Sequence, residues 1–389
     1  MNRTYDIIVV GGGVSGLSSA LSASLNGAET LVVDRKKQIG IPVRCGEFFP
    51  AQSEANDILP NSNSFKSFYS MMPTDAVSNR IESIRVFSPH SRRYEFPFGG
   101  WVLRRELFER AIAEKAEEAG AKIHTSTTVE SVEKTHSRMK ILAHGPEGKT
   151  FLEAKLVIGA DGFPSRVVQR EQFKSYLRDE NLALCVQLSA HGAKVDEEVV
   201  EMYLGKKYAP GGYAWVIPKG NGEVNVGVGA RLSYLKRGKS IVDYLTAFTK
   251  EHPIVSKYFH GVRFSPLIGK TLPVGGMTPY LCGDGILLVG DAAGLVIATN
   301  GSGIPTALAS GYIAGQVAAL HLKEACPLST YADTLKKEVG KSVRRGYLYR
   351  RIGDFFMRSD EALERLLQAM GTGNVAKVIK CVPIKPFFR

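Results

Sequence analysis

The chain has 389 residues, a formal net charge of +12 and an apolar fraction of 44%. Such a length suits two or three domains, and no uninterrupted apolar run reaches the roughly 18–20 residues that a membrane-spanning helix needs. The five cysteines are widely spread, without CxxC or metal-ligand spacing, which argues against a disulfide framework and a metal site. We therefore expect a soluble α/β enzyme of the cytoplasm.

The first 34 residues predict a nucleotide-binding unit of strand, glycine turn, helix, strand and acid. An apolar run, Tyr5–Val10, leads into Gly11-x-Gly13-x-x-Gly16, and a second apolar run ends in Asp34. Gly11 permits the tight turn, Gly13 lets a pyrophosphate approach the backbone, and Gly16 lets the helix pack close to the strand. The helix N-terminus offers N–H groups to phosphates. Asp34 can accept from a ribose hydroxyl, and we expect it at a solvent-exposed adenosine end.

The middle of the chain mixes helical and extended patterns. A helix is expected from Arg105 to Gly120, with a strand at Lys122–Thr125 and further strands from Ile141 to Ile158. Period-2 alternation over Ile81–Phe98 and Leu182–Ala230 predicts an antiparallel sheet.

The last part of the chain is predicted to be helical. A helix over Ile241–Glu251 follows the sheet, and helices from Thr330 onward are expected to break at Gly346, Gly371 and Pro383. Residues 336–389 carry thirteen Lys/Arg and five Asp/Glu, interleaved with aromatics. This composition fits peripheral contact with anionic lipid headgroups. The alternative is a solvated bundle whose aromatics form its own core. Nothing else in the chain supports binding of nucleic acid.

Two further apolar runs end in an acid. The run at 156–159 leads to Asp161-Gly162, and the run at 286–289 leads to Gly290-Asp291. A buried strand that ends in Asp at the carboxyl edge of a parallel sheet places a carboxylate where ligands bind. Each Asp also fits a turn or a helix cap.

These three motifs, in this order, resemble the FAD-dependent family with the p-hydroxybenzoate hydroxylase fold. The resemblance implies that the Asp161 motif supports the flavin end of FAD and that Asp291 holds the ribityl chain. It also implies that Arg105 contacts the cofactor, with Arg104 as an adjacent rival. A glycine-rich turn before a helix matches the family at Gly301, Gly303, Ile304 and Ala307. We also expect three further residues at the cofactor: Ser15, Phe48 and Val129.

A candidate substrate platform follows Pro210. On a strand, Tyr213, Trp215 and Ile217 share one face, which suits an extended apolar ligand or, alternatively, core packing. Together with Pro218 they resemble the Pro-x-x-Tyr-x-Trp-x-Phe-Pro motif of the geranylgeranyl reductases, with Ile217 in place of Phe.

The loop after Asp34 carries a second resemblance to that family. Cys45-Gly46-Glu47 is similar to the reductases' Cys-Gly-Glu segment, which implies that Cys45 and Gly46 lie at the flavin ring. As a catalytic residue, Cys45 would donate a proton, position the alkene or tune the flavin. A buried structural cysteine is the alternative.

The chain as a whole resembles geranylgeranyl reductases of the archaeal digeranylgeranylglycerophospholipid reductase type. The resemblance implies saturation of geranylgeranyl C=C bonds in membrane phospholipid precursors, with hydride from flavin N5 plus a proton. The electrons would come from an external donor, either NAD(P)H or a ferredoxin-like protein. The alternatives are an aromatic hydroxylase, a flavin-dependent halogenase, and a non-catalytic prenyl-lipid carrier that keeps flavin as a structural group.

The expected architecture is a Rossmann-type FAD-binding domain with an antiparallel substrate domain and a small C-terminal helical region. The cofactor domain is expected to be discontinuous, over 1–65, 100–175 and 271–325. The substrate domain takes 66–99 and 176–270, and the helical region takes 326–389.

Overall fold

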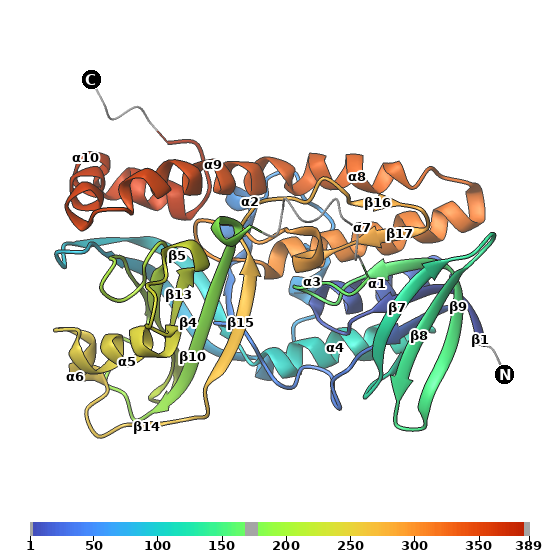
Figure 1. Ribbon diagram of the computed structural model, residues 1–389, viewed down its shortest axis with the longest axis horizontal. Coiled ribbons are helices and arrows are strands. Elements are labelled where there is room, and N and C mark those ends of the chain that lie inside the picture. The colour runs from blue at the N-terminus through green and yellow to red at the C-terminus, as the bar shows by residue number, and fades with distance from the viewer. Residues whose placement is uncertain (1–2, 168–177, 385–389) are drawn as a thin grey trace.

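The structure is a computed structural model that describes residues 3–167 and 178–384, with two sheets at opposite ends of its long axis (Figure 1). The eight-stranded sheet has the order β16-β17-β9-β1-β2-β6, and β8 and β7 continue from β9 as antiparallel neighbours. Its strands are β1 (Arg3–Val10), β2 (Thr30–Val33), β6 (Lys122–His124), β7 (Thr128–Lys134), β8 (Met139–Gly145), β9 (Gly148–Gly159), β16 (Cys282–Gly283) and β17 (Ile286–Leu288).

The central strands of this sheet are parallel. β1 pairs in parallel with β2 and β9, and β17 pairs in parallel with β9. Ile7, Ile8 and Val9 are completely buried, as expected for a parallel strand covered on both faces. The carboxyl ends of β1, β2, β9 and β17 therefore meet along one edge, and each is followed by a predicted ligand-binding motif.

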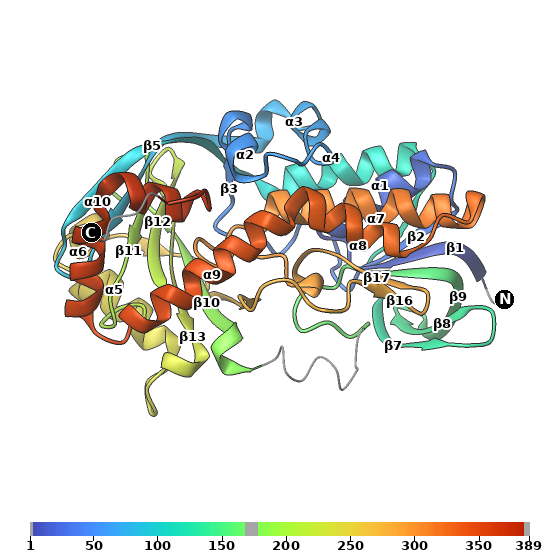
Figure 2. The same cartoon turned by 90° about the horizontal axis from the view of Figure 1, so that it is seen from above.

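Three long helices pack beside this sheet (Figure 2). α1 (Val14–Leu25) contacts both α4 (Arg105–Glu118) and α7 (Ile304–Glu324). At Gly311 and Gly315 of α7, an added Cβ would lie only 2.1 and 2.2 Å from backbone oxygens of α1. The two helices therefore approach more closely than side chains would permit, and Ser18 Oγ donates to the Leu308 carbonyl across the contact at 2.7 Å.

The nine-stranded sheet has the order β14-β10-β13-β12-β11-β4-β5-β3, with β15 also paired to β10. Its strands are β3 (Phe48–Pro50), β4 (Val77–Phe87), β5 (Arg93–Leu103), β10 (Leu182–His191), β11 (Val199–Tyr203), β12 (Tyr213–Gly220), β13 (Glu223–Arg231), β14 (Arg263–Phe264) and β15 (Ile268–Pro273). The pairings are antiparallel except for β11 with β4, so the predicted antiparallel sheet is confirmed.

One face of this sheet is covered by α5 (Ile241–Glu251), which begins with a capping box between Ser240 and Asp243. Ala214 and Val216 of β12 belong to the core on the α5 side. Trp215 belongs to the larger core on the other side, as the alternation of a strand requires. The shorter helices are α2 (Gln52–Ile58), α3 (Ser67–Ser70) and α6 (Val255–Tyr258).

The C-terminal part is helical, as predicted, and lies across both halves (Figure 1). It contains α8 (Ser329–Leu335), a π-helical turn at Lys336–Gly340, α9 (Lys341–Phe356) and α10 (Asp360–Ile379). The break expected at Gly371 is confirmed, because this residue has φ 63° and ψ 170° within α10.

The break predicted at Gly346 is wrong. This residue lies inside α9, where an added Cβ would be 3.0 Å from Ile297 and 3.3 Å from the Cys381 sulfur. The glycine is needed for close helix packing, and it does not end the helix.

The strands largely follow the predicted division into domains, with three differences. β5 runs across the boundary expected between residues 99 and 100. β3 lies within the segment 1–65 but pairs antiparallel with β5 in the nine-stranded sheet. β15 runs across the boundary expected between residues 270 and 271. The division into domains stays a prediction. Among the described residues, no helix combines the length and apolarity that crossing a bilayer demands.

Candidate cofactor and substrate site

A cavity of about 750 Å³ is lined by both sheets and by the C-terminal helices. Sixteen of the eighteen predicted site residues line it: Gly11, Gly13, Ser15, Asp34, Cys45, Gly46, Phe48, Arg105, Val129, Asp161, Tyr213, Trp215, Asp291, Gly301, Gly303 and Ile304. The cavity thus gathers motifs that are up to nearly 300 positions apart in the chain.

Gly16 and Pro218 do not line this cavity. An added Cβ at Gly16 would lie 1.8 Å from the Gly11 carbonyl oxygen, so Gly16 shapes the glycine loop from behind. Pro218 follows Ala214 and Val216 in the alternation of β12, which places it on the face away from Trp215.

The glycine loop presents an open cradle at the start of α1. Gly11 has φ 109°, a conformation that favours glycine, and Gly13 is the N-cap of α1 without any side-chain cap. An added Cβ at Gly13 would meet no atom within 4 Å. The first N–H groups of α1 therefore face free space, as an approaching pyrophosphate requires.

Asp34 holds this loop in place. Its Oδ2 accepts from the Gly12 N–H at 2.6 Å, and its Oδ1 accepts from the Lys36 N–H at 2.7 Å. That the adenosine ribose beside Asp34 is open to solvent stays a prediction, but the carboxylate itself is buried. The Asp34 side chain is 4% exposed, whereas that of Asp291 is 15% exposed. Burial alone therefore gives no reason to rank Asp291 above Asp34 in retaining a cofactor.

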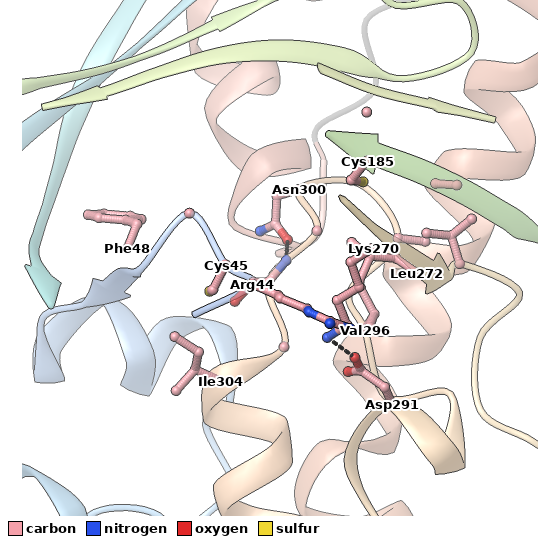
Figure 3. A pocket seen from close by; sticks show the side chains of 18 of the residues that line it. Arg44, Cys45, Phe48, Cys185, Lys270, Leu272, Asp291, Val296, Asn300 and Ile304 are labelled. Carbon is pink, nitrogen blue, oxygen red and sulfur yellow. Dashed lines mark hydrogen bonds and ion pairs between the residues drawn. The ribbon is translucent and has the colours of Figure 1, made fainter. Parts of the chain in front are cut away.

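Asp291 lies in the turn after β17 and forms an ion pair that the sequence analysis missed. The Lys270 Nζ lies 2.6 Å from Asp291 Oδ2 (Figure 3). Burial pulls the pKa of the Lys270 ammonium down, but the Asp291 carboxylate outweighs this effect and raises the pKa above its ordinary value. The sequence around Lys270 gives no sign of this ion pair, because only the fold brings β15 next to the turn that carries Asp291.

The start of α7 forms the wall beside Asp291. Gly303 is the N-cap of α7, again without a side-chain cap, and an added Cβ on it would lie 3.5 Å from Asp291 Oδ1. The Tyr213 hydroxyl donates to the Asn300 carbonyl in the turn before α7. The helix N-terminus thus adds partial positive charge to a wall that the second sheet holds in place.

Cys45 lines the same cavity as the glycine loop and Trp215. Its sulfur accepts from the Glu47 N–H at 3.2 Å. Burial lowers the pKa of the Arg105 guanidinium, but Glu109 and Cys45 outweigh this effect and raise it. The Cys45 carbonyl accepts from Gln187 at 3.0 Å. An added Cβ at Gly46 would be 2.8 Å from Ile217, so the glycine lets this loop touch the substrate platform.

Arg105 and Arg104 are distinguished by position. Arg105 lines the cavity and pairs with Glu109, whereas Arg104 is the exposed N-cap residue of α4.

Glu47, two residues after Cys45, is buried, and its Oε2 lies 2.9 Å from the Lys219 Nζ. Burial raises the pKa of the Glu47 carboxyl above its usual range, and the Lys219 ammonium counters only part of this effect.

Beyond Cys45 the cavity becomes an apolar chamber. The Trp215 indole N–H donates to Asn225 at 2.7 Å, and an added Cβ at Gly227 would lie 2.2 Å from the indole. The indole therefore lies flat against β13, with its other face toward the chamber. The remaining apolar walls come from β4, β11 and the C-terminal helices: Ile84, Val86, Val200, Met202, Leu363, Leu366, Leu367, Met370, Val375 and Val378.

The residues fit FAD. Two uncapped helix N-termini, the open space at Gly13 and the carboxylates of Asp34 and Asp291 offer what a pyrophosphate, ribose and ribityl chain need. Asp161 Oδ1 is also buried without a hydrogen-bond partner in the described structure, so an additional donor would be accommodated there.

Two family models match the chain. The model described as FAD dependent oxidoreductase matches residues 6–162, and the model described as geranylgeranyl reductase catalytic domain matches residues 181–262. A protein of Methanothermobacter thermautotrophicus named digeranylgeranylglycerophospholipid reductase 2 is 33% identical over 97% of this chain and 94% of its own length.

Solved structures share the fold. A geranylgeranyl bacteriochlorophyll reductase-like protein of Thermoplasma acidophilum superposes with a TM-score of 0.82 at 26% identity, over 95% of this chain and 92% of its own. The FAD-dependent chondrochloren halogenase of a myxobacterium superposes with a TM-score of 0.68 at 16% identity, over 100% and 94%. The second likeness shows the fold alone.

Replacing Gly13 with valine should abolish cofactor binding. The backbone at Gly13 has φ −89° and ψ −178°, which valine adopts without strain, so only the cradle is filled. We expect purified Gly13→Val to be folded but to lack flavin absorbance. Gly373→Val, on α10 and also in open space, is the matched control. Normal flavin content in Gly13→Val would contradict the placement.

The Lys270–Asp291 pair should show energetic coupling in the cofactor-free protein. Lys270→Met or Asp291→Asn alone leaves one partly buried charge unpaired, whereas the double variant removes both charges. We expect the double variant to be more stable than the sum of the single effects by about 1 kcal/mol or more. Urea unfolding of the four proteins measures this coupling, and additive effects would show that the contact contributes nothing.

Proposed function

The chain belongs to the geranylgeranyl reductase family, among the digeranylgeranylglycerophospholipid reductases, and from this premise we propose its reaction. It is an FAD-dependent oxidoreductase that saturates C=C bonds of geranylgeranyl chains in archaeal-type membrane phospholipid precursors. The proposal rests on one observation: a single cavity is lined both by the dinucleotide-binding motifs and by the apolar chamber.

The cofactor residues divide along the length of FAD. The N-terminus of α1 receives the pyrophosphate and Asp34 supports the adenosine side, whereas Asp291 receives the ribityl chain. When bound and reduced, the flavin supplies the hydride for alkene reduction. Lys270 and the N-terminus of α7 place positive charge at the flavin end of the cofactor site.

The chamber suits an isolated alkene. Such a bond has no carbonyl to polarise, so the protein's contribution is to exclude water and to hold the chain in reacting geometry. Trp215 and Ile217 of β12 line the chamber, and so do apolar side chains of α10. A small polar acid, as an aromatic hydroxylase takes, would leave these walls without a partner.

We propose Cys45 as the proton donor. Its thiol lies in the cavity between the cradle and the chamber, where the Glu47 N–H donates to its sulfur and the Arg105 guanidinium interacts with it electrostatically. Glu47 is a positioning residue, because its carboxylate accepts from the Arg105 N–H at 3.3 Å and thereby ties the Cys45 loop to α4.

Electrons are proposed to come from outside the chain. The sequence carries a single glycine-rich dinucleotide fingerprint, which FAD occupies, so NAD(P)H or a ferredoxin-like protein would act as a transient donor. We also propose peripheral contact with a membrane, since the substrate is a lipid.

The test is anaerobic incubation of the photoreduced holoprotein with a digeranylgeranylglycerophospholipid, followed by mass spectrometry of the lipid. We expect mass gains that correspond to saturated bonds and oxidation of the flavin without air. Turnover that needs oxygen would favour the hydroxylase or halogenase alternatives. Retention of unchanged lipid would favour the carrier.

Cys45→Ala should retain FAD and lipid but slow the chemistry. Loss of a positioned acid lowers rates by roughly 100-fold or more. Single-turnover oxidation of the reduced flavin by saturating lipid measures this rate. Cys185→Ala is the control, because Cys185 also lines the cavity and burial raises the pKa of its thiol to about 12. A wild-type rate and product in Cys45→Ala would make Cys45 structural, with water as the proton source.

Trp215→Ala should weaken lipid binding by about tenfold or more, since a large apolar contact is lost, while flavin content is unchanged. Titration of lipid against flavin fluorescence gives the dissociation constant. Trp101→Ala, a tryptophan outside the cavity, controls for general destabilisation. Unchanged lipid affinity in folded Trp215→Ala would remove Trp215 from the chamber wall.

A further inference from the structure

The outer face of α9 carries exposed apolar side chains at helical spacing. Leu348, Ile352 and Phe355 are 48%, 56% and 70% exposed, and their i, i+4, i+7 spacing puts them on one stripe. Other exposed large apolar side chains of the described residues are scattered over different elements. Such a stripe on the surface usually marks a binding surface.

Basic residues surround this stripe. Lys341, Arg344 and Arg351 of α9 are exposed, and so is Arg358 just beyond its end. The single acid of α9, Asp354, is turned inward and pairs with the buried Arg231 and Arg350. The exposed face of α9 therefore carries positive charge without a compensating carboxylate of its own helix.

The same helix is also a wall of the cavity. Ile352 is exposed on the outside and lines the cavity as well, together with Tyr349, Gly353 and Met357. Figure 2 shows α9 crossing the outside of the molecule between α8 and α10. The apolar stripe and the apolar chamber thus meet at one turn of one helix.

We propose that the outer face of α9 docks on an anionic lipid bilayer and that the prenyl chain enters the chamber beside Ile352. Leu348, Ile352 and Phe355 insert at the headgroup boundary, and the four basic side chains lie against lipid phosphates. Positive charge beside an apolar stripe matches an anionic membrane surface and does not match a neutral one. This inference rests on the proposed function for the identity of the lipid that enters.

Vesicle sedimentation tests the docking face. The holoprotein is mixed with phosphatidylcholine vesicles with and without phosphatidylglycerol. We expect binding to the anionic vesicles that weakens with salt. Arg344→Gln combined with Arg351→Gln should lower the partition coefficient by roughly 10- to 30-fold, and Leu348→Ser combined with Phe355→Ser should also lower it. Arg110→Gln with Lys250→Gln, and separately Leu25→Ser, change exposed residues elsewhere and should bind as wild type.

A tryptophan probe reports insertion directly. In Phe355→Trp, anionic vesicles should shift the indole emission to the blue, whereas Leu25→Trp should show no shift. Thermal unfolding of each variant establishes that it is folded. An unshifted emission from Phe355→Trp, or equal binding to neutral and anionic vesicles, overturns the docking face.

Activity separates this inference from the proposed reaction. With substrate in detergent micelles, the Leu348→Ser/Phe355→Ser variant should match wild type in single turnover, and with substrate in anionic vesicles it should be slower. If wild type binds vesicles through α9 but reduces no lipid in micelles, the reaction fails and the docking stands. If it reduces lipid in micelles and binds no vesicle, the docking fails and the reaction stands.

Discussion

The site depends on the close contact between α1 and α7. At Gly311 and Gly315 the backbones of these helices are too near for any side chain between them. This contact fixes the two uncapped N-termini relative to each other, although they are formed by residues 13 and 303. A dinucleotide that is too long for one helix N-terminus can then be held by the N-termini of α1 and α7 together. The parallel strands β1, β9 and β17 place Asp161 and Asp291 in the same frame.

The second sheet completes the site by covering this frame. The Tyr213 hydroxyl reaches the turn before α7, and Gln187 and Asn225 hold the Cys45 carbonyl. Three strands of this sheet thus hold the turn before α7 and the Cys45 loop in place. A halogenase shares the fold at 16% identity, and a shared fold does not determine the chemistry. The reductase proposal therefore depends on the walls of the chamber and on the family of the chain.

The sequence predicted the motifs that depend on local geometry. Glycine turns after apolar strands, Asp at strand ends and the alternation around Trp215 need only neighbouring residues for their meaning, and all are found where expected. The Lys270–Asp291 pair and the apolar wall of α10 could not be predicted, because they arise from contacts between distant segments. Gly346 was misassigned since a glycine in a helix looks the same whether it breaks the helix or allows close packing. The burial of the Asp34 carboxylate could not be predicted, because its acceptance of two backbone N–H groups is not visible in the sequence.

The packing of the Trp215 indole against Gly227 has a consequence for the width of the chamber. The indole can recede only because β13 has no side chain at that position. The width available to a chain at this point is therefore set from behind, by a residue that no ligand touches. A methyl group at position 227 would push the ring forward and act as a constriction. Homologous proteins with identical ligand-contacting residues could in this way accept chains of different bulk, and a comparison limited to contact residues would overlook the determinant.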